Sequence, residues 1–278
     1  GRVCALALGG DVLFVGGDFD SVGTIRRPHL AAIGVADAAP SAWNPQTDNR
    51  VSTLLLEGPL VYAGGRFTQV AGLPRPYVAA IDRATAIPTL WSPGVDAQVN
   101  ALALRDTTIF IGGYFSYVGD SLRPNLAAVS TVTARIQPWN AWVRRLPDFS
   151  YDGGPRVSAL LLRDSVMFVA GSFKSIGGQA RQGLAAINVH TAAATSWDPR
   201  TYSAIMFGAY FRAMALCGDT IFVAGQADSI AGQASSYLAA LNVQTAMRFN
   251  WDPSPNWEVF ALADGPGTLY AGGGFTSV

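Results

Sequence analysis

Apolar residues lie in short runs along this sequence, separated by turns rich in glycine, proline and polar side chains. In one representative stretch, residues 51–56 and 60–63 are two such runs on either side of a Glu-Gly-Pro turn. A polar loop leads to a third run at residues 77–81, and a weaker fourth run ends at Trp91. Runs this short, bounded by glycine and proline, predict β-strands rather than helices. We therefore expect four short antiparallel strands in this stretch.

The first runs are apolar at consecutive positions, as at residues 3–8, 101–104 and 158–162. An antiparallel strand with one solvated face alternates apolar and polar residues. The lack of alternation predicts burial on both faces, as for strands that lie between two neighbouring sheets. The third runs contain Leu-Ala-Ala, and the alanines suit a close approach between sheets.

The pattern repeats along the whole chain. A doublet of small residues marks each copy, at residues 16–17, 64–65, 112–113, 170–171, 224–225 and 272–273. A tryptophan follows the second doublet residue by 26 residues in five copies, at Trp43, Trp91, Trp139, Trp197 and Trp251. From each tryptophan to the next doublet glycine the distance is 22, 22, 32, 28 and 22 residues. Every insertion therefore falls on one type of loop, on one side of the molecule.

Four short strands in a repeat of about 48 residues predict an all-β fold, a β-propeller of four-stranded antiparallel blades. We expect one domain over residues 1–278, with five blades and half of a sixth. Its repeats are about 1–49, 50–97, 98–155, 156–210 and 211–256, followed by a partial copy at 257–278. Because residues 257–278 match residues 1–22, these two halves cannot complete one blade. We therefore expect the sequence to be a fragment of a longer chain.

Several repeated residues have structural interpretations. The doublets suit either close packing between blades or a bulge that ends the second strand. The aromatic residue after each doublet, Phe19 in the first copy, is expected to pack between blades. Asp82, Asn188 and Asn242 each precede a Thr-containing turn, where a side-chain oxygen can accept a backbone N–H two residues on. We interpret this as turn chemistry rather than metal binding.

Composition removes several classes of function. Half of the 278 residues are hydrophobic, 14% are charged and the formal net charge is zero. Neither a nucleic-acid footprint nor polybasic attraction to a membrane is indicated. No apolar run reaches the roughly 18 residues that span a bilayer, so direct membrane insertion is not expected. Cys4 and Cys217 occupy non-equivalent repeat positions, and we expect two small buried side chains rather than a disulfide.

Catalytic and metal-binding chemistry is not predicted. The two histidines, His29 and His190, fall at different strand ends and should not share a site. They form neither a metal ligand set nor a Ser-His-Asp arrangement. The sequence has no Asp-x-Asp-x-Asp calcium loop, and no helix follows residues 16–19 that could hold a nucleotide phosphate. We expect no catalytic residues, no metal and no cofactor.

Equivalent arginines form the first candidate binding set. Arg27, Arg75, Arg123 and Arg181 each lie ten residues after a doublet glycine. Strand parity places their loops on the same face as the loops that follow the tryptophans. Arg27 and Arg75 could therefore form ion pairs with Asp48 and Asp96. Alternatively, a ring of guanidinium groups could bind an acidic ligand such as a carboxylated glycan.

The two insertions form the second candidate set. Residues 140–154 and 198–211 occupy the same loop type in consecutive repeats, so they should be neighbours on one face. Both are rich in aromatic residues and arginine, which anchor interfaces and stack on sugars. The alternative is that the two loops fold over each other and only cover the propeller. The candidate binding residues are Trp142, Arg144, Arg145, Phe149, Tyr151, Tyr202, Ile205, Met206, Phe207 and Tyr210.

The repeat itself resembles a known family. Val-Gly-Gly-Asp-Phe at residues 15–19, Arg27, Leu-Ala-Ala-Ile at 30–33 and Trp-Asn-Pro at 43–45 resemble the delta-60-type repeat of bacterial surface and secreted β-propellers. The resemblance extends over the whole chain. Departures occur at residues 224–227, at Ser235 in place of the repeat arginine, and in the two insertions. The resemblance implies a non-catalytic module of a large extracellular protein, often beside adhesive or carbohydrate-binding modules.

Together these observations predict a non-catalytic binding or assembly module, secreted or attached to the cell surface. The expected partner is a protein subunit or a cell-surface glycan, contacted through the face of the insertions. A place in a larger assembly is compatible with this expectation. One alternative is a carbohydrate-active hydrolase or lyase with its site at the mouth of the propeller channel. Another is an inert structural spacer.

Overall fold

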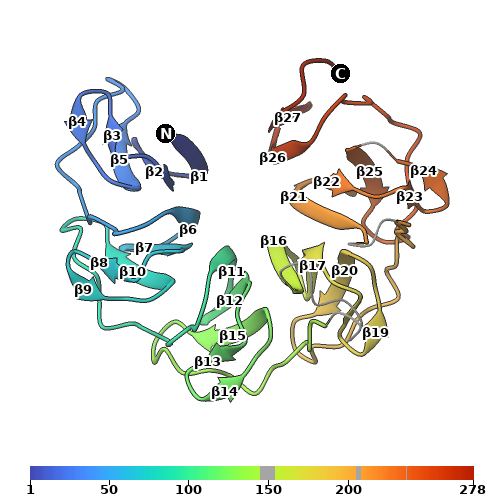
Figure 1. Ribbon diagram of the computed structural model, residues 1–278, viewed down its shortest axis with the longest axis horizontal. Helices are drawn as coiled ribbons and strands as arrows, with labels where there is room; N and C mark the ends of the chain where they lie inside the picture. The colour runs from blue at the N-terminus through green and yellow to red at the C-terminus, as the bar shows by residue number, and fades with distance from the viewer. Residues whose placement is uncertain (145–153, 205–207, 236) are drawn as a thin grey trace. The chain divides into compact units, whose positions relative to one another are not determined.

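The computed structural model describes residues 1–144, 154–204, 208–235 and 237–278, and every helix or strand among them is a β-strand. The chain divides into two compact units (Figure 1). The first unit comprises Gly1–Arg123 and Ala127–Pro138, and the second comprises Pro124–Leu126 and Trp139–Val278.

Each of the first three repeats forms a three-stranded antiparallel sheet. The order within each sheet follows the sequence, with the second strand in the centre. The strands are β1 (Arg2–Gly9), β2 (Val12–Asp18) and β5 (Leu30–Gly34); β6 (Val51–Glu57), β7 (Leu60–Gly65) and β10 (Val78–Asp82); and β11 (Val99–Arg105), β12 (Thr108–Gly113) and β15 (Leu126–Ser130). Within the first unit, β6 lies between and contacts β1 and β11.

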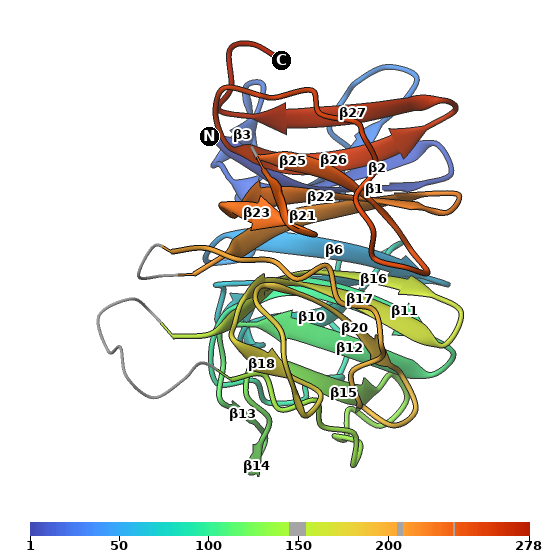
Figure 2. The same cartoon turned by 90° about the vertical axis from the view of Figure 1, so that its right-hand side faces the viewer.

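The second unit continues the same pattern. Its sheets consist of β16 (Arg156–Arg163), β17 (Val166–Ser172) and β20 (Leu184–Asn188); β21 (Tyr210–Cys217), β22 (Thr220–Gln226) and β25 (Leu238–Asn242); and the pair β26 (Val259–Gly265) and β27 (Thr268–Gly273). In Figure 2 these sheets stack on one another, with β21 in contact with both β16 and β26.

A small hairpin fills the polar loop between the second and third strands of each complete repeat, which the sequence did not predict. Its two strands have two residues each, too few to leave a hydrophobic period. The hairpins are β3 (Ser21–Val22) with β4 (Ile25–Arg26), β8 (Gln69–Val70) with β9 (Leu73–Pro74), β13 (Tyr117–Val118) with β14 (Ser121–Leu122), β18 (Ser175–Ile176) with β19 (Gln179–Ala180), and β23 (Ser229–Ile230) with β24 (Gln233–Ala234).

The expected fourth strand is present only as a single bridge beside the third. The bridges are Ile33 to Pro40, Ile81 to Pro88, Val129 to Ile136, Ile187 to Ala194, and Leu241 to Arg248. In each repeat an alanine with positive φ precedes this segment, such as Ala86 at 63°. Only a few residues then remain before the tryptophan, and proline at 40 and 88 has no N–H to donate.

The core lies between consecutive repeats. Val61, Tyr62 and Ala63 are consecutive in β7, and all three are buried, so this strand is covered on both faces as predicted. In β10, Ala79 packs in the cluster that spans the first two repeats, whereas Ala80 packs in the cluster that spans the second and third. Adjacent alanines therefore face opposite neighbours, which explains their small size. The first strands are less buried than expected, since residues 52–56 of β6 are only partly buried.

The two doublet residues have different roles. A Cβ on Gly64 would lie 2.6 Å from a methyl group of Val99, in the first strand of the next repeat. A Cβ on Gly65 would lie 2.1 Å from the carbonyl oxygen of Arg50, which directly precedes the first strand of the same repeat. The bulge lies in the first strand opposite the doublet, where Ser52 is the extra residue, rather than at the end of the second strand.

The tryptophans connect one repeat to the next. Trp91 packs edge-on against Tyr62 of its own repeat, with ring centroids 5.2 Å apart, and its Nε1 donates to the carbonyl of Ser130 at 2.9 Å. Trp43 makes the same pair of contacts with Phe14 and Asp82, and Trp197 with Phe168 and Asn242. For these three tryptophans the acceptor is the last residue of the third strand of the following repeat.

The turns after the third strands have the predicted chemistry. Oδ1 of Asp82 accepts the backbone N–H groups of Ala84 and Thr85 at 3.0 and 2.7 Å. These bonds, that of Thr85 first, hold the pKa of Asp82 below its usual range. Asn188 and Asn242 make equivalent bonds.

The cysteine prediction was wrong in one respect. Cys4 and Cys217 are unpaired, as expected, but both are exposed rather than buried. Cys4 is the extra residue of the bulge in β1, and Cys217 ends β21 beside a hairpin turn. Neither position places a side chain between two sheets.

Candidate interaction face

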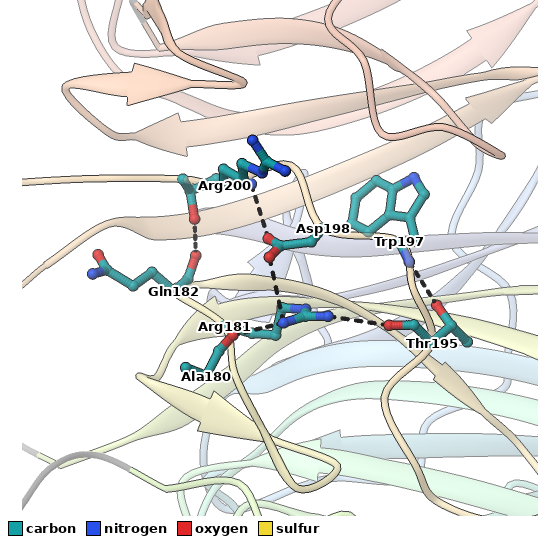
Figure 3. Close-up of polar contacts among 8 residues, drawn as sticks. Ala180, Arg181, Gln182, Thr195, Trp197, Asp198 and Arg200 are labelled. Atoms are coloured by element: carbon teal, nitrogen blue, oxygen red, sulfur yellow. Dashed lines mark hydrogen bonds and ion pairs between the residues drawn. The ribbon is translucent and has the colours of Figure 1, made fainter.

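The repeated arginines bind backbone carbonyls within their own repeats. Nη2 of Arg75 donates to the carbonyl of Thr89 at 2.6 Å, and Nη1 donates to that of Pro74 at 2.6 Å. Arg27, Arg123 and Arg181 make the equivalent pairs of bonds. Figure 3 shows Arg181, which also forms an ion pair with Asp198 at 3.3 Å. These guanidinium groups therefore hold the segment before each tryptophan in place.

The ion pairs expected between these arginines and Asp48 or Asp96 are not formed. Oδ1 of Asp48 instead accepts the backbone N–H groups of Thr68 and Gln69, at 2.8 and 3.0 Å, in the next repeat's small hairpin. Burial alone would raise the pKa of Asp48, but the hydrogen bonds from Thr68 and Gln69 outweigh it and lower the pKa. Asp96 accepts the equivalent N–H groups of Ser116 and Tyr117. The loop after the tryptophan is thus attached to the following repeat by a carboxylate.

In the two repeats with insertions, another residue stands at the position of the aspartate that makes this attachment. Arg144 and Tyr202 stand five residues after Trp139 and Trp197, at the position of Asp48 and Asp96. The backbone carbonyl of Arg144 accepts both hairpin N–H groups, from Lys174 and Ser175, and that of Tyr202 accepts those of Asp228 and Ser229. Because the backbone makes the attachment, the side chains of Arg144 and Tyr202 are not needed for it.

The first insertion presents two side chains to solvent. Ala141 and Val143 are buried, whereas Trp142 is 41% exposed and Arg144 is exposed. The guanidinium carbon of Arg144 lies 4.9 Å from the centroid of the Trp142 ring, a cation–π contact. Trp142 has φ of 46°, a left-handed conformation that is costly for a bulky side chain.

The second insertion also exposes an arginine and an aromatic side chain, but with the arginine first in the sequence. Arg200 occupies the position of Trp142 and has the same φ of 46°, and Tyr202 occupies the position of Arg144. Arg200 is exposed and Tyr202 is 55% exposed. The alternate residues, Thr201 and Ser203, are buried. Arg200 was not among the predicted binding residues, although its position three residues after Trp197 was the available signal.

Contacts within the second unit connect the two insertions. Lys174, whose N–H bonds to the carbonyl of Arg144, extends toward Gly208, where a Cβ would lie 2.4 Å from its Nζ. Gly208 belongs to the second insertion. Arg181 and Gln182, which follow the hairpin containing Lys174, contact Asp198 and Thr201 at the start of that insertion (Figure 3). We define the insertion face as Trp142, Arg144, Arg200 and Tyr202.

The other predicted residues of the insertions are placed differently. Arg145, Phe149, Tyr151, Ile205, Met206 and Phe207 lie outside the described residues. Tyr210 is in β21, where its hydroxyl bonds to Glu258 and its ring lies 5.3 Å from the guanidinium carbon of Arg212. Burial first, and then the hydrogen bond to Glu258, raise the pKa of Tyr210.

The histidines lie where the sequence placed them. His29 enters the third strand of the first repeat, with Nδ1 3.8 Å from a carboxylate oxygen of Asp18, and His190 lies in an Asx turn of the fourth repeat. Among the residues that the structure describes, no three His, Cys, Asp or Glu side chains are grouped as metal ligands would be. The described part of the chain also contains no helix long and apolar enough to cross a membrane.

Neither a protein-family model nor a curated protein matches this sequence. Several solved structures resemble the fold at low sequence identity. The β-propeller domain of Cps50 (Swd1) from Myceliophteria thermophila has a TM-score of 0.60 and 10% identity, over 97% of this chain and 80% of that chain. A chain of the mitotic checkpoint complex has a TM-score of 0.60 and 14% identity, over 97% and 71%. The WD40 domain of Pan2 from Neurospora crassa has a TM-score of 0.56 and 11% identity, over 95% and 69%.

At these identities the likeness shows the fold and nothing further. The chain is therefore an all-β protein of the β-propeller class, as the repeat pattern predicted.

Proposed function

We propose that the chain is a β-propeller with repeats of about 48 residues, of which this sequence holds five and the first half of a sixth. We propose further that it is a non-catalytic protein-interaction module that uses the insertion face. The observation that carries this proposal is the pair of exposed arginine–aromatic couples, Trp142 with Arg144 and Arg200 with Tyr202. Arginine, tryptophan and tyrosine are the residue types most enriched among residues that dominate binding energy.

The departures from the repeat support this proposal. In the first two repeats the side chain of an aspartate, Asp48 or Asp96, accepts the N–H groups of the next hairpin. In the two repeats with insertions a backbone carbonyl accepts them instead, and the side chains of Arg144 and Tyr202 are exposed. The left-handed backbone at Trp142 is shared by the same position of the other repeats, as at Gln46 and Gly94, so it belongs to the fold. What distinguishes the third repeat is a large, exposed aromatic side chain at that position, which supports a binding role.

The partner and location follow from the resemblance to delta-60-type repeats. We propose a bacterial protein that is secreted or attached to the cell surface, with a protein subunit as partner. A solved neighbour of this fold comes from a protein complex, the mitotic checkpoint complex, which supports the protein class of partner. A cell-surface glycan is the second candidate, because exposed Trp142 and Tyr202 rings can stack on sugars. A hydrolase or lyase needs groups that transfer protons, and of the four residues of this face Tyr202 alone has one, without a histidine or carboxylate beside it in the set.

Photo-crosslinking in cells that make the protein tests the proposal. A benzophenone amino acid is placed at position 142, at position 202 and, as the control, at Leu90, which is 93% exposed in the first unit. We expect one discrete adduct shared by positions 142 and 202 and missing at position 90, and its mass identifies a protein or a glycan. Identical adduct patterns at all three positions, or adducts at position 90 alone, would contradict the proposal.

A further inference from the structure

A second group of arginines lies in the first unit, away from the repeated set. Arg2 begins β1, Arg50 directly precedes β6, and Arg66 directly follows β7. The backbone N–H of Arg66 donates to the carbonyl of Arg50 at 2.9 Å, so these two residues are cross-strand neighbours. The strands β1 and β6 contact each other, and the charge of Arg2 acts on Arg50, so Arg2 belongs to the same group. We call Arg2, Arg50 and Arg66 the arginine cluster.

Among the three described arginines of the cluster, Arg50 alone has a buried nitrogen without a hydrogen-bond partner. Its Nε is shielded from solvent and has no hydrogen-bond partner among the described residues. The hydroxyl of Ser52, two residues along β6, is buried and unpartnered in the same way. Buried polar atoms are usually satisfied, so the Arg50 Nε and the Ser52 hydroxyl, two residues apart in the sequence, are both free to donate to an acceptor.

Arg66 is held so that its terminal nitrogens remain available. Its Nε donates to Oε1 of Gln98 at 2.6 Å, and Gln98 in turn contacts Asn100 in β11. This bond uses only one edge of the guanidinium. The Nη groups, which could form a bidentate pair with an oxyanion, make no hydrogen bond to another described residue.

The charges around Arg50 are unbalanced. Burial, followed by the positive charges of Arg66 and Arg2, lowers the pKa of Arg50, while Cys4 and Asp18 act in the opposite direction. The Asp18 carboxylate also lies 3.8 Å from His29. The repeated arginines differ in their terminal nitrogens. The Nη groups of Arg123 and Arg181 donate to backbone carbonyls, and Arg181 also pairs with a carboxylate, although their Nε atoms, like that of Arg50, are buried without a partner.

The fold does not require arginine at these positions. The position of Arg50 is also arginine at Arg2 and Arg156, but it is Gln98, Tyr210 and Glu258 in the other repeats. The position of Arg66 is Tyr114 or Gly274 in two other repeats. The same backbone geometry therefore accepts neutral, aromatic and acidic side chains. A structural explanation, which is sufficient for Arg75, does not apply to Arg50 and Arg66.

We propose that the arginine cluster is a binding site for an oxyanion, with Arg50 and Arg66 as the charged donors and the Ser52 hydroxyl as a neutral one. A carboxylate or phosphate oxygen at this place would satisfy the buried Nε of Arg50 and offset the repulsion between the three cations. The acidic-ligand site that the sequence suggested for Arg27, Arg75, Arg123 and Arg181 is thus assigned to a different group of arginines. The site is independent of the insertion face.

Titration followed through arginine Nε–Hε NMR signals tests this site. The ¹⁵N-labelled protein at about 20 mM ionic strength, where surface charges are least screened, is titrated with citrate and, separately, with a hexaglutamate peptide. We expect saturable shifts of the Arg50 and Arg66 signals. Tighter binding of citrate would point to a small free anion, and tighter binding of the peptide would point to acidic side chains of a partner chain.

Three variants make the test specific. R50Q and R66Q each remove one charged donor and should weaken binding by about tenfold or more. R135Q removes the same charge from an exposed turn of the first unit and should change affinity by less than about twofold. Arg66 is exposed, so R66Q is expected to fold even if R50Q does not. Shifts that do not saturate, or an equal loss in R135Q, would overturn the site.

Discussion

Arg248 in the fifth repeat occupies the place that Arg181 occupies in the fourth, although it comes from a different segment. Arg181 donates to the carbonyl of Ala180 and pairs with Asp198 at 3.3 Å. Arg248 donates to the carbonyl of Ala234, equivalent to Ala180, and pairs with Asp252 at 3.2 Å. Ser235 stands where the repeat arginine would be. The guanidinium has therefore been retained while its point of attachment has moved from the loop to the segment before the tryptophan.

This substitution predicts a rescue. The side chain of Arg248 is 3% exposed, so R248A should lower the free energy of unfolding by about 2–3 kcal/mol, because it leaves the Ala234 carbonyl and the Asp252 carboxylate without their donor. Restoring the repeat arginine in S235R/R248A should recover most of that loss. Urea unfolding of the three proteins measures both effects. If the double variant were less stable than R248A, the equivalence of the two arginines would be refuted.

The doublet glycines predict a contrast between two alanine substitutions. G65A places a methyl group 2.1 Å from the carbonyl oxygen of Arg50 and should destabilise the protein by about 3 kcal/mol or more. G272A meets no atom within 4 Å and should change stability by less than about 0.5 kcal/mol. Both are measured by chemical unfolding, and similar effects of the two substitutions would contradict the account of the doublet.

The left-handed conformation of Trp142 predicts which replacement the protein tolerates. Left-handed backbone costs a residue with a Cβ about 1 kcal/mol, and glycine escapes this cost but loses more entropy on folding. W142G should therefore be as stable as W142A or up to about 1 kcal/mol more stable, although glycine is normally the worse choice. Thermal unfolding compares the two variants. At Val132, which is exposed and has no positive φ, the same pair should show the usual order, with alanine more stable.

The Asp48 attachment predicts a pH dependence. The pKa of Asp48 is lowered in the folded state, so its stabilising effect is fully present above the usual pKa of an aspartate and is lost as pH falls through the lowered value. D48N should reduce stability at pH 7 by about 0.5–1 kcal/mol, since the bonds are exposed. The difference between D48N and the wild-type protein should shrink below about pH 4. A difference that is constant from pH 7 to pH 2.5 would show that the charge of Asp48 does not contribute.

Much of the fold follows from the sequence because the repeat multiplies each weak signal. The second and third strands, the Asx turns at Asp82 and Asn188, and the structural role of the doublets could all be predicted. The arginines could not be assigned in the same way. A regularly spaced polar residue suits either a ligand or a backbone carbonyl, and only the position of the Thr89 oxygen decides for Arg75. The exposed Arg200 was missed because its residue type varies between repeats while its conformation does not.

The backbone bonds at Arg144 and Tyr202 have a consequence for how this protein can vary. At the start of each insertion, the carbonyl of Arg144 or Tyr202 is hydrogen-bonded to the next hairpin. At its end, the chain enters a first strand at Arg156 or Tyr210. The two ends of the loop are thereby fixed by main-chain atoms that every amino acid possesses. Loop length and composition can therefore diversify without loss of the underlying sheets, much as variable loops do on an antibody framework.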